Sequence, residues 1–335
     1  MSTYKTLEKG ARTWYDSIVM EWVLLGLAVL AVIIFAITYW TYAVTFYSPK
    51  KRNYNIFDIP QGEQYDKDRE RMVQLIKDMD AVSYEEVRIL ALDGTPLFAR
   101  YYHVADGAPL QIEFHGYKGT SIRDFCGGAK LAWKLGHNTL AVDQRAIGQS
   151  GGTTITFGLK ERYDVLSWID YAKERFGQDV PIYLAGVSMG ATTVLMASGF
   201  DLPSNVKGII ADCPFSSPED IIYSVAKDMG YPPKLAMPFI KLGAKLFGKF
   251  DLTETTAAEQ VKKAKVPILI MHGEDDWFVP CRMSEEIYLA NPEKITRETF
   301  AGAGHGLSYI ENAPKYERLI TELVERCERE NEKIK

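Results

Sequence analysis

The chain has 335 residues, of which 47% are apolar and 25% are charged, a balance typical of a folded globular protein. The formal net charge is only −5 at neutral pH, and no clustered basic segment of the kind found in nucleic-acid-binding proteins occurs in the sequence, so no nucleic-acid partner is expected. The four cysteines are far apart and form no Cys-x-x-Cys pair, so neither a zinc site nor a disulfide framework is expected.

An uncharged segment near the N-terminus departs from this average composition. Residues 22–49 contain no charged side chain, and residues 23–37 form the unbroken apolar run VLLGLAVLAVIIFAI. As a helix, residues 22–42 would cover roughly 30 Å, the thickness of the hydrocarbon core of a bilayer. Aromatic residues flank both ends, as they do at membrane interfaces. We therefore predict a short tail over residues 1–21 and a transmembrane anchor over residues 22–47.

Two alternatives to an anchor are a buried core helix and a cleaved signal peptide. The apolar region of a signal peptide is usually about 7–15 residues long, and no small-x-small cleavage site follows this segment. Basic residues flank both sides of the span, so the positive-inside rule favours neither orientation. They are Lys5, Lys9 and Arg12 before the span and Lys50, Lys51 and Arg52 after it.

The next segment predicts a connection and then a helix. Residues 48–62 are polar and contain Pro49, Pro60 and Gly62, which is typical of a linker. From Tyr65 to Met79, apolar residues recur at helical spacing between charges, which predicts an amphipathic helix. We therefore assign residues 48–80 to a linker and helix that lead into a folded domain over residues 81–335.

Strands and helices alternate from Tyr84 onward. Eight strands are predicted, over residues 85–92, 95–104, 109–117, 138–145, 180–188, 206–214, 266–273 and 295–302. Asp93-Gly94 is a hairpin turn between the first two, whereas the middle strands are short apolar runs, as in a parallel sheet covered on both faces. Helices are predicted over residues 121–135, 159–176, 189–198, 282–290 and 313–326. This order predicts an α/β fold with a mostly parallel, eight-stranded sheet and one antiparallel edge.

One connection is much longer than the others. About 50 residues separate the strand that ends near Cys213 from the strand that starts at Val266, which predicts a helical cap inserted over about residues 215–262. Residues 229–250 of this cap carry four lysines beside an apolar stripe at helical spacing. The stripe is Leu235, Phe239, Leu242, Leu246 and Phe250. Two interpretations stay open: a helix over the core with solvated lysines, or an element near anionic headgroups that lines an acyl-chain pocket.

The segment GVSMG, residues 186–190, lies between a predicted strand and a predicted helix. A serine hydroxyl group is a poor nucleophile and needs a base that is itself oriented by an acid. In a Gly-x-Ser-x-Gly turn, Gly186 and Gly190 would leave room for backbone that approaches closely, and the helix start would supply an N–H group. The pattern also occurs in simple turns, so the role of Ser188 as a nucleophile depends on its partners.

Candidate partners follow the ends of other strands. Asp275 and Asp276 come after the seventh predicted strand and His305 after the eighth, in the Ser-Asp-His order that this architecture requires. The backbone N–H groups of Tyr117 and Met189 are the expected oxyanion donors. We expect the other four histidines to be structural, with His115 orienting its loop. The remaining three are His103, His137 and His272.

From about Tyr84 to the C-terminus, five motifs together resemble the alpha/beta-hydrolase superfamily. They are FHGY, DQRAIGQSGG, GVSMG, HGEDDWFVP and AGAGHG. Within the superfamily, the chain is similar to membrane-tethered, lysophospholipase-like and protein-depalmitoylase-like serine hydrolases. The resemblance implies an alpha/beta-hydrolase fold and places the acid on Asp276 rather than Asp275. It also implies that Asp143 and Arg145 are a pair that braces a loop.

The expected activity is hydrolysis of carboxylic esters or thioesters, including lipid-like ones, by Ser188, His305 and Asp276, with no metal or organic cofactor. A serine peptidase of the prolyl-oligopeptidase type is an alternative, although it would usually bring a large additional domain. A non-catalytic binding protein is another. A dinucleotide-binding enzyme is disfavoured because GAGHG lacks the Gly-x-Gly-x-x-Gly spacing. Because every residue assigned to chemistry lies beyond Tyr84, we expect the anchor, residues 1–47, to be separable from the domain.

Overall fold

The computed structural model describes residues 2–49 and 55–332 and contains one eight-stranded sheet, in the order β1-β2-β4-β3-β5-β6-β7-β8. All eight predicted strands are present. Their bounds are β1 Glu85–Leu90, β2 Pro96–Tyr102, β3 Leu110–Phe114, β4 Asn138–Asp143, β5 Ile182–Val187, β6 Val206–Asp212, β7 Ile268–Gly273 and β8 Ile295–Phe300.

The sheet is parallel except at β2, which runs antiparallel to both β1 and β4. The antiparallel pairing therefore lies near one edge of the sheet, as predicted. The strand that runs opposite to the others is β2, which is next to the edge strand β1. The parallel strands β3 to β8 end along the same side of the sheet. In open α/β sheets, ligands bind in the crevice outside these carboxyl ends.

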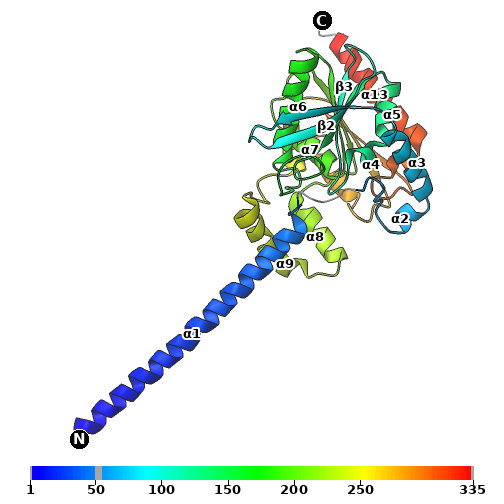
Figure 1. Cartoon of the computed structure of the whole chain (residues 1–335). Helices are drawn as coiled ribbons and strands as arrows, with labels where there is room; N and C mark the ends of the chain where they lie inside the picture. The colour runs from blue at the N-terminus through cyan, green and yellow to red at the C-terminus, as the bar shows by residue number, and fades with distance from the viewer. Residues whose placement is uncertain (1, 50–54, 333–335) are drawn as a thin grey trace.

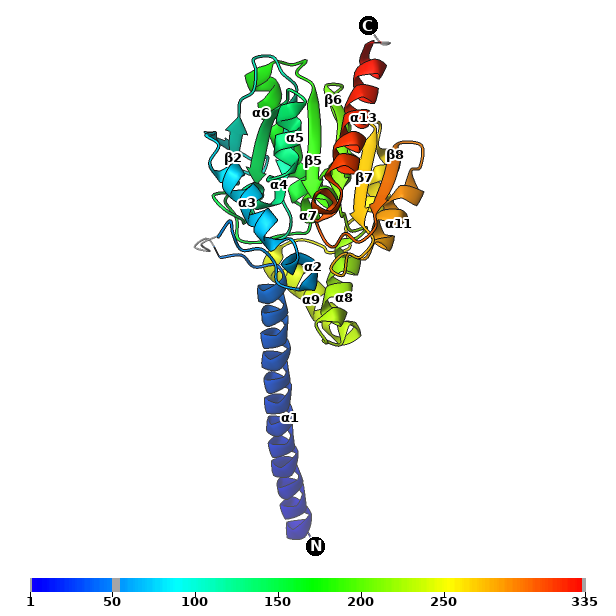
Figure 2. The same cartoon turned by 90° about the vertical axis from the view of Figure 1, so that its right-hand side faces the viewer.

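Helices cover both faces of the sheet (Figure 2). One face carries α3 Arg69–Asp80, α4 Ser121–Phe125, α5 Gly128–Lys134 and α13 Ala313–Glu332. The other carries α6 Glu161–Phe176, α7 Met189–Ala197, α10 Ala257–Gln260 and α11 Arg282–Ala290. The predicted helix over residues 121–135 is divided into α4 and α5 near Gly127, where a side chain would collide with the ring of Tyr309.

The predicted cap is helical and lies between β6 and β7. It contains α8 Pro218–Asp228, α9 Pro233–Gly243 and a π-helical turn over Ala244–Gly248. Ser217 caps α8, since its hydroxyl group accepts the backbone N–H of Glu219. Short helices complete the fold: α2 Glu63–Asp66, a 3₁₀ turn over Val261–Lys263, and α12 Ser308–Glu311.

The N-terminal segment is a single helix, α1, over Ser2–Thr45, so the predicted tail is helical from Ser2 onward. Figures 1 and 2 show α1 projecting from the base of the domain, with the cap beside its C-terminal end. By length and composition, Ser17–Thr45 could cross a membrane. Most of the large apolar side chains of this stretch are exposed, and they become buried only near its end. Lys50, Lys51 and Arg52, which entered the orientation argument, lie outside the described residues.

The C-terminal end of α1 packs into the folded domain, which argues against a separable anchor that ends at residue 47. Tyr42 and Phe46 belong to the larger apolar core. The ring of Phe46 packs edge-on against the rings of Phe157 and Phe250. Just beyond the helix, the backbone N–H of Ser48 donates to the carbonyl oxygen of Thr153, 2.9 Å away. The domain is therefore completed by residues that the sequence assigned to the anchor.

The predicted linker and helix also pack onto the domain. Tyr65, Ile76 and Met79 are buried in the second apolar core, on the side of the sheet that α3 and α13 cover. Sequence periodicity predicted the apolar face of α3. It did not predict that this face completes the core on one side of the sheet.

Candidate active site

Ser188 occupies a strained turn between β5 and α7. Its φ and ψ angles are 55° and −116°, a left-handed conformation that non-glycine residues rarely adopt and that costs about 1–3 kcal/mol. A Cβ atom on Gly190 would overlap the carbonyl oxygen of Phe114, and one on Gly186 would overlap the backbone of Gly190. The two glycines therefore allow the tight strand-to-helix turn that directs the Ser188 side chain away from the sheet.

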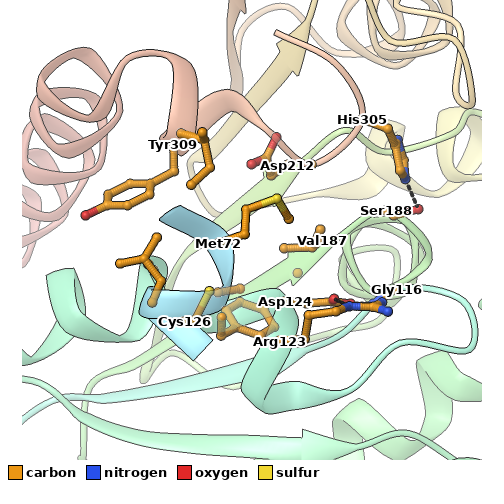
Figure 3. A pocket seen from close by; sticks show the side chains of 18 of the residues that line it. Met72, Gly116, Arg123, Asp124, Cys126, Val187, Ser188, Asp212, His305 and Tyr309 are labelled. Carbon is orange, nitrogen blue, oxygen red and sulfur yellow. Dashed lines mark hydrogen bonds and ion pairs between the residues drawn. The ribbon is translucent and has the colours of Figure 1, made fainter. Parts of the chain in front are cut away.

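The structure brings Ser188, His305 and Asp276 together from three different loops. The Nε2 atom of His305 lies 3.0 Å from the Oγ atom of Ser188, and Nδ1 lies 2.7 Å from the Oδ2 atom of Asp276. Figure 3 shows the Ser188–His305 contact. When Nδ1–H donates to the carboxylate, Nε2 can accept the proton of the serine hydroxyl group.

Of the two adjacent carboxyl groups, the structure places Asp276 against His305. Its Oδ1 atom accepts the backbone N–H groups of Phe278 and Val279, at 2.9 and 2.7 Å. The Nε2 atom of His272 lies 3.2 Å from Oδ2. Asp276 is 6% exposed, whereas Asp275 is exposed to solvent. Contacts other than the one with His305 therefore hold both carboxylate oxygens of Asp276 in place.

The ionisation of this pair follows from its burial and from its opposite charges. Burial lowers the pKa of His305, but the Asp276 carboxylate outweighs this effect and raises that pKa well above its usual value. Burial raises the pKa of Asp276, but His305 and His272 outweigh it and hold that pKa well below its usual range. The site thus stabilises a positively charged imidazole, the form that His305 has after accepting a proton.

The loop after β3 lies against the elbow. A Cβ atom on Gly116 would be 3.4 Å from the Cβ atom of Ser188. The N–H of Gly116 donates to the Oδ2 atom of Asp124, 2.8 Å away, and Arg123 pairs with the other oxygen of that carboxylate at 2.7 Å. Tyr117, the next residue in this loop, therefore lies beside Ser188 on a braced backbone.

His115 and His137 occupy structural positions. The Nε2 atom of His115 accepts the backbone N–H of Gln144 at 3.0 Å, and Nδ1 lies 2.8 Å from the carbonyl oxygen of Gly116. Burial lowers the pKa of His115, so its ring stays neutral and holds the loop. His137 stacks on Tyr183, and burial lowers its pKa to about 4.

Asp143 and Arg145 both brace loops, but through separate partners. The Oδ1 atom of Asp143 accepts from the guanidinium group of Arg100 at 2.9 Å. Arg145 makes a two-pronged ion pair with Asp164, at 2.7 and 2.5 Å, and a further pair with Asp93. The resemblance implied that both residues brace a loop, and the structure gives each of them its own carboxylate or guanidinium partner.

Two cavities meet at Ser188. The first, of about 320 Å³, lies on the side of the sheet covered by α3–α5 and α13 and is bordered by His305, Arg123 and Met72 (Figure 3). The second, of about 430 Å³, lies between the C-terminal end of α1 and the cap helices α8 and α9. Both volumes are within the range of pockets that bind small molecules.

Several residues at the site were not predicted. Asp212, the last residue of β6, lines the first cavity, and burial raises its pKa to about 6. The thiol of Cys213 lies close to Asp276 and His305, with their candidate ligand atoms within 4.8 Å of one another. A metal ion there would compete with hydrogen bonds that both ring nitrogens of His305 already make. Both residues lie at the end of β6, and this position could have identified them as site residues from the sequence.

Residues before the domain also fix the backbone of His305 by hydrogen bonds. The Oε1 atom of Gln64 accepts the backbone N–H of His305 at 3.0 Å, and the hydroxyl group of Tyr65 donates to its carbonyl oxygen at 3.1 Å. No local pattern predicted these contacts, because they join α2 to a loop about 240 residues later in the sequence.

Comparison with known proteins identifies the fold. Residues 112–253 match the family model described as the alpha/beta hydrolase fold. The uncharacterized protein YqkD of Bacillus subtilis is 28% identical over 192 residues, which cover 57% of this chain and 63% of that protein. The lysophosphatidylserine lipase ABHD12 of Rattus norvegicus is 27% identical over 248 residues, 68% of this chain and 59% of the lipase.

The chain spans between half and two thirds of the length of these curated relatives. Among solved structures, an esterase of Pyrococcus furiosus superposes with a TM-score of 0.60 at 22% identity, over 75% of this chain and 93% of the esterase, which is a likeness of fold. The chain therefore has the alpha/beta-hydrolase fold and is similar to lysophospholipase-like serine hydrolases.

Proposed function

We propose that this protein is a membrane-anchored serine hydrolase that cleaves carboxylic esters or thioesters of acyl lipids through an acyl-enzyme. The observation that carries the proposal is the chain of hydrogen bonds from Ser188 through His305 to Asp276, at 3.0 and 2.7 Å, on a strained elbow. This arrangement supplies the nucleophile, the base and the group that orients the base.

The chemistry proceeds in two steps. The Oγ atom of Ser188 attacks the acyl carbonyl carbon while Nε2 of His305 takes the hydroxyl proton, which then passes to the departing oxygen or sulfur. The products of this step are an acyl ester on Ser188 and a free alcohol or thiol. Water then attacks the acyl ester, His305 takes a proton from the water and returns it to Ser188, and the carboxylic acid leaves.

Two features support transition-state stabilisation. The proposed oxyanion donors are the backbone N–H groups of Tyr117 and Met189, which lie in the loop beside Ser188 and at the start of α7. Removing one such donor typically costs about 3 kcal/mol of transition-state stabilisation. Asp276 in turn stabilises the imidazolium that forms when His305 holds the proton.

Two further observations support the membrane and the lipid class of substrate. The exposed apolar surface of α1 needs a nonaqueous environment, and Ser17–Thr45 is long enough to cross a bilayer. The rat relative carries the name lysophosphatidylserine lipase. A lipid ester held at a membrane surface would suit both features.

A fluorophosphonate tests the proposal, because it reacts with serines activated by a neighbouring base. We expect peptide mapping to find one stable adduct, on Ser188, and none after heat denaturation of the protein. Labelling of a different serine, with Ser188 unmodified, would contradict the assignment.

A further inference from the structure

The geometry points to an acyl-chain site between the membrane helix and the cap, and we propose that the chain enters it directly from the bilayer. The site is the second cavity, whose walls are the end of α1 on one side and α8 and α9 on the other. This inference rests on the proposed function, because it assigns the two sides of the ester to the two cavities at Ser188.

The position of His305 decides which cavity holds which part of the substrate. His305 returns its proton to the leaving oxygen, so the leaving group must lie on the side of the imidazole ring. Among the described residues, His305 borders the first cavity and is not among those that line the second. The leaving group therefore occupies the first cavity, and the acyl chain extends into the second.

The lining of the second cavity suits an alkyl chain. Its walls are almost wholly apolar. An alkyl chain buried there leaves water, and few polar groups of the protein lose hydrogen bonds to water in exchange. The helix α1 contributes Trp40 and Val44, and the cap contributes Ile221, Val225 and Ile240. The first cavity differs, because Gln64, Arg123 and Asp212 give it polar groups that can contact a headgroup.

The contacts between α1 and the cap set the depth of the second cavity relative to the membrane. The charge-free part of α1 begins at Trp22, and about 30 Å of helix from there ends near Tyr42. The rings of Phe35 and Tyr39 pack against the ring of Phe247 in the cap, with centroids 5.6 and 5.3 Å apart. Phe35 lies about 10 Å along the helix from Tyr42, so the part of the cap around Phe247 enters the hydrocarbon region by up to about that depth.

Exposed residues of the cap fit this depth. Met229 is 67% exposed, Leu235 69% and Leu246 54%, a degree of exposure that is unfavourable in water and favourable among lipid chains. Lys234 and Lys245 lie on the same cap segment, where long basic side chains can reach anionic headgroups. The second interpretation left open for the cap, a membrane-facing element that lines an acyl pocket, therefore agrees with its packing.

The lining of the second cavity reaches the protein surface at an aromatic pair near this level. Trp40 of α1 and Tyr231 of the cap both line the cavity, and their rings lie 6.1 Å apart. Both side chains are about half exposed, at 51% and 46%. Because these two rings are in edge-on contact, they must move apart for an acyl chain to pass between α1 and the cap, a route that reaches Ser188 without crossing water.

Photo-crosslinking tests which cavity holds the chain. The probe is a decyl fluorophosphonate with a diazirine at the end of its alkyl chain, added to the full-length protein in phosphatidylcholine vesicles. Ser188 forms the P–O bond, fluoride leaves, and His305 takes the hydroxyl proton. Illumination then joins the chain end to its neighbours. We expect crosslinks in residues 40–45 and in α8 or α9. Crosslinks in α3 or α5 would overturn the inference, whereas failure to label Ser188 would overturn the proposed function on which it rests.

A matched pair of variants provides a second test. Val44→Trp places a large ring at the wall of the second cavity, whereas Val32→Trp makes the same change at an exposed position nearer the N-terminus of α1 that does not line the cavity. We expect Val44→Trp to lower the ratio of kcat/KM for p-nitrophenyl palmitate to that for p-nitrophenyl acetate by about 10-fold or more. Val32→Trp should leave this ratio unchanged. An unchanged ratio in Val44→Trp, or an equal fall in Val32→Trp, would overturn the inference.

Discussion

The hydroxyl group of Tyr117 donates a hydrogen bond to the backbone carbonyl oxygen of Thr45, 2.8 Å away. Tyr117 belongs to the loop proposed to bind the oxyanion, and Thr45 is the last residue of the helix proposed to cross the membrane. The bond therefore joins the proposed reaction centre to the end of α1 and indicates that anchor and domain act as one folded unit.

Two truncations that differ only in where they cut α1 should therefore behave differently. A protein that begins at residue 36 keeps Tyr42, Phe46 and the contact to Tyr117, whereas one that begins at residue 48 loses all three. Loss of a buried aromatic side chain commonly costs about 3–5 kcal/mol, so the shorter protein should melt at a lower temperature and hydrolyse p-nitrophenyl acetate more slowly. Equal melting temperatures and equal turnover in detergent would show that α1 is separable after all.

The two adjacent carboxylates should differ sharply. Asp276→Asn removes the charge that orients His305 and should lower kcat by about 10⁴-fold, as loss of the orienting acid does in related triads. Asp275→Asn changes an exposed side chain and should lower kcat less than threefold. Steady-state kinetics on one soluble ester compare the two variants, and a greater loss in Asp275→Asn would shift the assignment of the acid by one residue.

The pH dependence of activity should report the charge coupling at His305. The imidazole must be neutral to act as a base, so kcat/KM should rise with pH through the pKa of His305, which Asp276 raises against the effect of burial. Asp276→Asn removes the negative charge. In the pH profile of the kcat/KM that remains in this variant, the acid limb should therefore lie at lower pH. Asp275→Asn serves as the control and should keep the midpoint of the native protein. An unshifted limb in Asp276→Asn would contradict the coupling.

Stability should depend on pH through Glu113 on β3. Its side chain is fully buried, Gln111 donates to it at 2.9 Å, and burial raises its pKa to about 8. The unfolded chain loses this proton near pH 4–5. The contribution to stability is therefore complete below that pH and is lost as pH rises to about 8, by at most about 1.4 kcal/mol per pH unit. Chemical denaturation measures the free energy of unfolding at pH 5 and at pH 8. Between these two pH values, Glu113→Gln should lose less of this free energy than the native protein, and equal losses would contradict this.

The residues of the sheet and the elbow were predictable because their signals are local. Short apolar runs and the turn residues around Asp93-Gly94 predicted all eight strands, and the two glycines around Ser188 predicted the turn that the structure contains. The order of Asp276 and His305 along the chain was informative because both follow parallel strands, whose carboxyl ends lie at one edge of the sheet.

The contacts that complete the site were not predictable, because they join distant segments. Gln64 and Tyr65 reach His305 from a stretch that resembled a linker, and Phe46 fills a core position from a stretch that resembled an anchor. From residue 22 to residue 45, the composition of α1 is that of a membrane helix throughout. Its contacts with distant residues, such as the packing of Phe46 against Phe157 and Phe250, distinguish the end that belongs to the domain.

The central claim is that Ser188 is the nucleophile, and the turnover of Ser188→Ala tests it most directly. The comparison is kcat on p-nitrophenyl butyrate for the native protein, Ser188→Ala and Ser204→Ala, an exposed serine that serves as the control. We predict a loss of about 10⁴-fold or more in Ser188→Ala, with an unchanged melting temperature, and native turnover in Ser204→Ala. A Ser188→Ala protein that is folded and hydrolyses the ester at a rate near that of the native protein would contradict the account.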